Sequence, residues 1–170
     1  MRARRTSLGA VCILLLLVAN LPASRGQSLA DVQARFDGET NSVRKVKLLE
    51  KLGDVQFEEA RKAGKARDHG TVDVTLEKYR DNVRAALEAL KKQHPNAEKQ
   101  SDGYRRLQIY LRKGIREVDE TLLVALDAYQ PPLQIVREDL NAIEKELLKM
   151  IFPRRPAEQP AATPPAEKQP

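Results

Sequence analysis

The stretch GYRRLQIYLRKGIREVDETLLVALDAYQPPLQIVREDLNAIEKELLKMI, residues 103–151, decides the fold of this chain. Apolar side chains recur every three or four residues on both sides of Pro131-Pro132: Tyr104, Leu107, Leu111, Ile115, Val118, Leu122, Ala125 and Tyr129 before the prolines, and Leu133, Val136, Leu140, Ile143, Leu147 and Ile151 after them. This spacing predicts two helices, each with one apolar face. Because such faces must be buried, we expect the prolines to reverse the chain and bring both faces together. The alternative is a kink within one long helix.

The residues before this stretch show the same helical spacing and no strand-like alternation. We predict a short helix over 29–36, a long helix from residue 40 or 41 to Gly70, and a third over 71–94 that Pro95 stops. Their main apolar stripes comprise Val43, Val46, Leu49, Leu52, Val55 and Ala60, and then Leu76, Tyr79, Val83, Leu87 and Leu90. The sequence therefore predicts an all-α fold, an elongated antiparallel helical bundle of about four main helices arranged as two helical hairpins.

Two glycines, Gly53 and Gly114, fall inside these predicted helices, where glycine costs about 1 kcal/mol relative to alanine. They are either hinges or points where two helices approach closely. We favour close helix contact.

The N-terminus has the pattern of an export signal. Arg2, Arg4 and Arg5 precede an apolar run of about 14 residues, whereas a membrane-spanning helix needs about 20. We predict a signal peptide over 1–26, cut after Gly26, and favour general secretion over the twin-arginine route. The alternative is a short anchor that is not cut. Lipidation at Cys12 is not expected, because Val11 precedes it and it lies near the start of the run.

Removal of this segment changes the charge and the redox chemistry of the chain. The whole sequence carries 30 basic and 24 acidic residues, and the segment holds four arginines and no acid, so 26 basic and 24 acidic residues remain. A net charge of +2 argues against nucleic acid as the partner. The single cysteine is also lost, which suits an oxidising compartment but provides no disulfide.

The last 18 residues, PRRPAEQPAATPPAEKQP, contain six prolines and no large apolar side chain. Such a segment cannot bury enough surface to offset its ordering entropy. We therefore predict a helical-bundle domain over 27–152 and a disordered proline-rich tail over 153–170.

Residues with catalytic or metal-binding chemistry are sparse. His69 and His94 both fall at predicted helix C-termini, where a cation is favoured by the helix dipole, and neither has a second histidine three or four residues away. Carboxylates occur as adjacent pairs such as Glu58-Glu59, which point about 100° apart on a helix. No nucleophile or phosphate-binding motif is present. We expect a protein that is not an enzyme and carries no cofactor or metal.

Two basic clusters are the remaining candidates for binding. One comprises Arg44, Lys47 and Lys51, and the other Arg105, Arg112 and Arg116. Both clusters lie in the N-terminal halves of their predicted helices, where the dipole disfavours cations. An anionic envelope component or an acidic protein is therefore one candidate partner. The alternative, which we favour, is a solvated face.

Several apolar residues lie off the main stripes: Leu48, Phe57, Ile109, Leu123, Leu126, Ile135 and Leu148. They either widen the buried faces, which we favour, or form a seam for a second chain or an unfolded client.

The block over 47–90 resembles exported bacterial helical-hairpin domains in its helix-typical composition and its spacing of Tyr and Leu. No functional residue follows from this resemblance. We expect a binding or scaffold module of the bacterial cell envelope, periplasmic or extracellular, with no membrane span once the signal is removed. The alternative is an envelope chaperone or stress sensor. The sequence leaves the oligomeric state open.

Overall fold

The computed structural model describes residues 28–153 of the chain. The predicted signal peptide and nearly all of the predicted tail lie outside these residues. The described part is helical throughout, without strands. Its elements are α1 (Leu29–Gly38), α2 (Ser42–Lys65), α3 (His69–Gln93), α4 (Ser101–Val124), the 3-10 turn η1 (Asp127–Tyr129) and α5 (Gln130–Ile151).

The first three helices begin at polar caps, which explains where they start. The side chains of Ser28, Asn41 and Asp68 each accept a hydrogen bond from a backbone N–H three residues later. These side chains satisfy N–H groups that have no partner within the helix.

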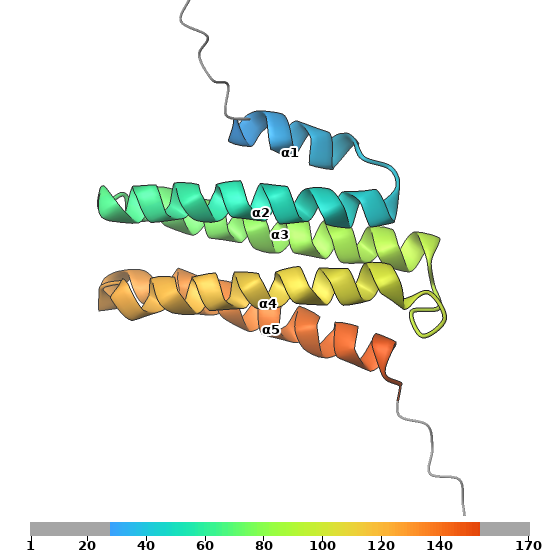
Figure 1. Ribbon diagram of the computed structural model, residues 1–170. Coiled ribbons are helices and arrows are strands. Elements are labelled where there is room, and N and C mark those ends of the chain that lie inside the picture. Colours follow the sequence, from blue (N-terminus) through green and yellow to red (C-terminus); the bar gives the residue numbers. More distant parts are fainter. Residues whose placement is uncertain (1–27, 154–170) are drawn as a thin grey trace, which may run out of the picture.

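The helices form two antiparallel hairpins that pack on each other (Figure 1). α2 pairs with α3, and α4 pairs with α5. The second hairpin lies against the first so that α4 contacts α2 and α5 contacts α3. The short α1 packs on α2, on the side away from α4. The prediction of an all-α bundle built from two hairpins is confirmed for the described residues.

The chain reverses near Pro131-Pro132, as expected, but the prolines do not end α4. That helix already stops at Val124, and both prolines lie in the first turn of α5, where a missing N–H costs nothing. The predicted continuation of the helical stripe to Ala125 and Tyr129 is therefore wrong. The apolar spacing runs on through the connection although the backbone has left the helix.

The α2–α3 connection also differs from the prediction. α2 ends at Lys65 rather than at Gly70, and Gly70 lies in the first turn of α3. His69 consequently stands at a helix N-terminus, so the dipole argument made for it is wrong. His94 does cap the C-terminus of α3, as expected.

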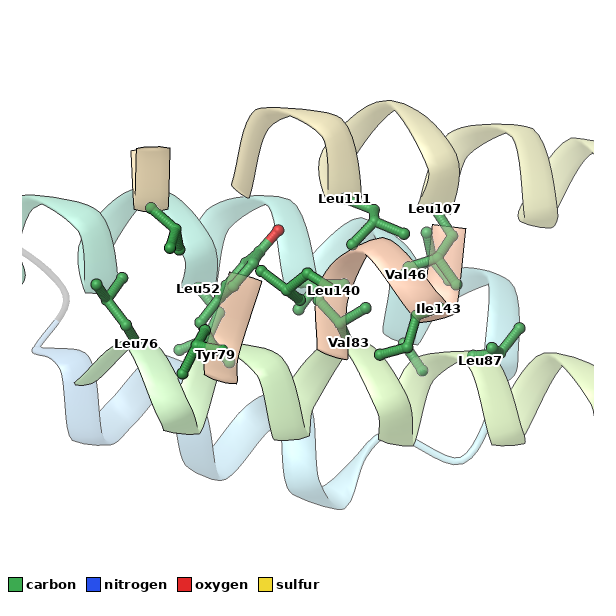
Figure 2. Packing of buried hydrophobic residues seen from close by; sticks show 14 of the residues in the cluster. Val46, Leu52, Leu76, Tyr79, Val83, Leu87, Leu107, Leu111, Leu140 and Ile143 are labelled. Carbon is green, nitrogen blue, oxygen red and sulfur yellow. The ribbon is translucent and has the colours of Figure 1, made fainter. Parts of the chain in front are cut away.

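The core runs between the hairpins and contains most residues of the predicted stripes, whereas Val55 lies outside the core cluster and Tyr129 is exposed. Figure 2 shows ten of its side chains labelled: Val46, Leu52, Leu76, Tyr79, Val83, Leu87, Leu107, Leu111, Leu140 and Ile143. All are buried, and they come from α2, α3, α4 and α5. Gly53 and Gly114 both lie against the ring of Tyr79 in this core. Their interpretation as points of close helix contact is confirmed.

None of the helices in the described range of 28–153 combines the length and the apolar character needed to cross a membrane.

Candidate functional site

The basic cluster on α2 is exposed, and one of its members already has a partner. Arg44 Nε lies 3.2 Å from Glu39 Oε2 in the α1–α2 connection. A hydrogen bond from the Asn41 backbone, together with the Arg44 charge, holds the pKa of Glu39 below its usual range. Arg44 thus contributes to the geometry of this connection. Lys47 and Lys51 are exposed and form no ion pair within the described residues.

The basic cluster on α4 shows the same division. Arg112 Nε lies 2.6 Å from Glu144 Oε1 and ties α4 to α5. Arg105 and Arg116 are exposed and form no ion pair in the part of the chain that the structure describes.

The bounds of α4 also change the dipole argument. Because α4 spans Ser101–Val124, Arg112 lies at its middle and Arg116 in its second half. The prediction that all three arginines occupy the N-terminal half is wrong for Arg116. The dipole acts mainly on the first turn, so in this cluster it disfavours only Arg105.

The two clusters lie on neighbouring helices but do not merge into one patch. In the described structure, three side-chain hydrogen bonds cross the seam between α2 and α4. Tyr110 Oη donates to Glu50, Lys113 Nζ donates to Asp54, and Arg61 Nη1 donates to Glu117. The seam between the clusters is therefore occupied by acids and their partners.

A small hollow opens along this seam above the ring of Tyr79, with a volume of about 190 Å³. Its lining includes Phe57, Tyr110, Lys113 and Arg116. Small-molecule sites usually enclose about 300–1,000 Å³. A wider and more open depression of about 460 Å³ lies beside Ile109 and Arg112, where Glu144 already binds the guanidinium. Neither hollow combines sufficient enclosure with unpaired polar groups.

The histidines have local partners. The ring of His69 stacks on that of Tyr129, with centroids 3.8 Å apart and planes 12° apart. His94 Nδ1 lies 3.0 Å from Gln100 Oε1. Within residues 28–153, no three His, Cys, Asp or Glu side chains are grouped so that they could hold a metal ion.

The seven off-stripe apolar residues divide between core and surface. Phe57 is buried and Leu48 and Leu148 are half-buried, which agrees with the interpretation that they widen the core. The same interpretation is wrong for the four exposed members, Ile109, Leu123, Leu126 and Ile135.

The main concentration of exposed apolar surface lies at the α4–α5 connection. Leu123, Val124 and Leu126 are 85%, 83% and 66% exposed, and Tyr129 is 39% exposed. We call these four residues the apolar end. Sequence reasoning missed Val124 and assigned Tyr129 to the core. The run LLVAL at 122–126 was the available signal, because five consecutive apolar residues exceed what one helix face can bury.

Comparison of the chain with protein-family models, with curated proteins and with solved structures gave no match. The function therefore has to be inferred from the residues of this chain alone.

Proposed function

We propose that this chain is an exported, non-enzymatic helical-bundle protein that acts as a binding or scaffold module in the bacterial cell envelope. The observation that supports binding is the apolar end. Three large aliphatic side chains within four residues are 66–85% exposed, on a bundle whose main apolar stripes are largely buried. A contiguous apolar patch of this kind on an otherwise charged surface is typical of an interaction site.

The location of the patch suits a module that binds through one end. The apolar end is the connection between the two helices of the second hairpin, so its backbone is held at both sides by the packed α4 and α5. Gln130 Nε2 donates to the carbonyl oxygen of Ala125 at 3.2 Å and braces the turn. Interaction residues on a short connection between rigid elements are positioned before they meet a partner.

The alternative of a chaperone with an apolar seam for unfolded clients has less support. Ile109 and Leu123 lie 14 residues apart on α4, about 21 Å along the helix. Charged residues, among them Arg116 and Glu120, lie on the exposed side of α4 between them. An extended client would thus meet charge in the middle of the proposed seam.

In-cell photo-crosslinking tests this proposal. A photoreactive residue is placed at Leu126 or, as the matched control, at Ile109, which is equally exposed at 65%. We expect an adduct at position 126, seen as a protein band or as a lipid-sized increase in intact mass, and little or none at 109. Equal adducts at both positions, or none at 126, would contradict binding through the apolar end.

A further inference from the structure

We propose that the apolar end docks on the surface of an anionic lipid bilayer. Leu123, Val124 and Leu126 enter the headgroup region, and Lys65 and Arg67 bind the lipid phosphates. This inference rests on the proposed binding function and names the partner of that same site.

The cations and the apolar residues lie at the same end of the bundle. The α2–α3 and α4–α5 connections emerge side by side at the left in Figure 1. The stack of His69 on Tyr129 joins them, and the Arg61–Glu117 ion pair joins α2 to α4 nearby. Residues at 62–67 and 123–129 can therefore meet one flat surface together.

Arg67 carries the most specific signal. Its φ of 59° places it in the left-handed region, the one non-glycine residue with positive φ in the described range. The backbone N–H of Arg67 donates to the Gly64 carbonyl oxygen, and the backbone N–H of Asp68 donates to the Ala63 carbonyl oxygen. These two hydrogen bonds end α2, and the left-handed residue at such a helix end is usually glycine. Because an arginine here costs backbone strain that a glycine would avoid, its presence suggests that the side chain has a function.

The side chains of Lys65 and Arg67 are available to a ligand. Both residues are exposed, and neither side chain forms an ion pair or hydrogen bond within the described residues. The neighbouring cations differ in this respect, because Arg61 pairs with Glu117 and Lys62 with Glu58.

Acids also occur at this end and limit the charge effect. Asp68 accepts hydrogen bonds from the Thr71 N–H and hydroxyl, and Asp127 accepts one from Gln130. Glu120 is exposed one turn before Leu123 and Val124. The apolar side chains must therefore provide most of the affinity, with Lys65 and Arg67 providing the preference for anionic lipid.

The shape and size of the patch favour lipid over a protein. A stable protein interface buries about 800 Å² on each partner, far more than three aliphatic side chains and one tyrosine can offer. Exposed apolar side chains with cations beside them instead supply the two attractions of an interfacial membrane contact, burial of apolar area and charge attraction to anionic lipid. Tyrosine is also enriched at membrane–water interfaces.

This docking would orient the rest of the molecule. α5 has 22 residues and so extends about 33 Å from the apolar end to the point where the proline-rich segment starts. Pro153, the last described residue, would then lie on the side of the bundle that faces away from the bilayer.

Vesicle flotation tests the proposal with the protein purified from its own cells. Vesicles of phosphatidylcholine alone are compared with vesicles that contain 30% phosphatidylglycerol. We expect binding to the anionic vesicles, at least tenfold weaker for Leu123→Ser/Leu126→Ser and unchanged for the control Ile109→Ser. Arg67→Gly should bind the anionic vesicles several-fold more weakly although its fold is retained.

Three outcomes would overturn the lipid assignment: no binding to either vesicle, equal binding by the double serine variant, or undiminished binding by Arg67→Gly. If vesicles fail to bind while crosslinking at Leu126 captures a protein, the proposed binding function stands and only the lipid assignment is wrong. Circular dichroism of each variant shows whether a loss of binding reflects unfolding.

Discussion

The ring of Tyr79 lies so close to the backbone of Gly114 that a Cβ atom added at residue 114 would stand 2.2 Å from Tyr79 Cε1. On its other side, a Cβ atom at Gly53 would stand 3.0 Å from Cε2 of the same ring. The Tyr79 hydroxyl donates to the Tyr110 carbonyl oxygen at 2.9 Å. One buried tyrosine thus fills the space that two helical glycines leave where α2, α3 and α4 meet.

Gly114→Ala should destabilise the protein, although alanine is the better helix former. The added methyl group would meet a buried ring that also packs against Gly53 and Phe57, and overpacking of this kind typically costs about 1–3 kcal/mol. Urea unfolding measures the change. Gly64→Ala is the control, because its Cβ would lie 3.9 Å from Val72 Cγ2, and it should stabilise by about 0.4–1 kcal/mol. A gain in stability for both variants would mean that Tyr79 does not occupy this space.

Alkaline pH should reveal the burial of Tyr79. Burial, followed by the nearby charges of Asp54 and Glu117, raises the pKa of its hydroxyl well above the ordinary value of 10.0. Below pH 10 the phenol is neutral in both states. Above pH 10 the unfolded chain loses this proton and the folded chain keeps it, so the free energy of unfolding falls with rising pH.

Tyr79→Phe is the variant for this measurement. At pH 8 the substitution should lower the free energy of unfolding by about 1 kcal/mol, because it removes the hydrogen bond to the Tyr110 carbonyl oxygen. Its stability should then fall less steeply than that of the wild type between pH 9.5 and 11. Part of the slope should remain, because burial also raises the pKa of Tyr104 and Tyr110. Parallel pH profiles would show that Tyr79 ionises freely in the folded protein.

Arg67→Gly should stabilise the fold by about 0.5–1 kcal/mol, because glycine adopts the left-handed backbone of this position without strain. Thermal unfolding of the variant and of Lys65→Gly provides the comparison. Lys65 ends α2 in a helical conformation, so the glycine there should destabilise. Destabilisation of Arg67→Gly would show that the arginine side chain contributes to the fold itself.

Gln56→Met should be neutral or stabilising, by up to about 2 kcal/mol. Gln56 is 1% exposed, and its Oε1 accepts no hydrogen bond in the described structure. A buried polar group without a partner costs about 1–3 kcal/mol, and the unbranched methionine fits a similar volume. Chemical denaturation tests this. A loss of more than 1 kcal/mol would indicate that the amide has a partner, such as a bound water.

The helices were predictable because their stripes are long and regular. The ends of the helices were harder to predict, for a different reason in each case. The three-to-four spacing continues through Ala125 and Tyr129 by coincidence of composition, so hydrophobic periodicity alone could not place the end of α4. The start of α3 was marked by Asp68 and Thr71, a capping pair that the expected stop at Gly70 obscured.

The basic clusters could be found from the sequence, but only one of their two ion pairs could be predicted from it. Glu39 is five residues before Arg44 and was within reach of local reasoning. Glu144 is 32 residues after Arg112, so this pair depends on how α4 packs against α5. The exposure of the apolar end likewise could not be predicted without knowing how the helices pack, because packing decides which face of each hairpin is covered.

Native mass spectrometry of the C-terminally tagged protein, recovered gently from its own cells, tests the central claim most directly. The claim is that an exported chain binds an envelope component through its apolar end. We expect a mass that begins at Gln27 together with a bound companion, lipid or protein. The companion should disappear in Leu123→Ser/Leu126→Ser and persist in Ile109→Ser. A mass that still contains residues 1–26, or a chain that begins at Gln27 and carries no companion, would contradict the claim.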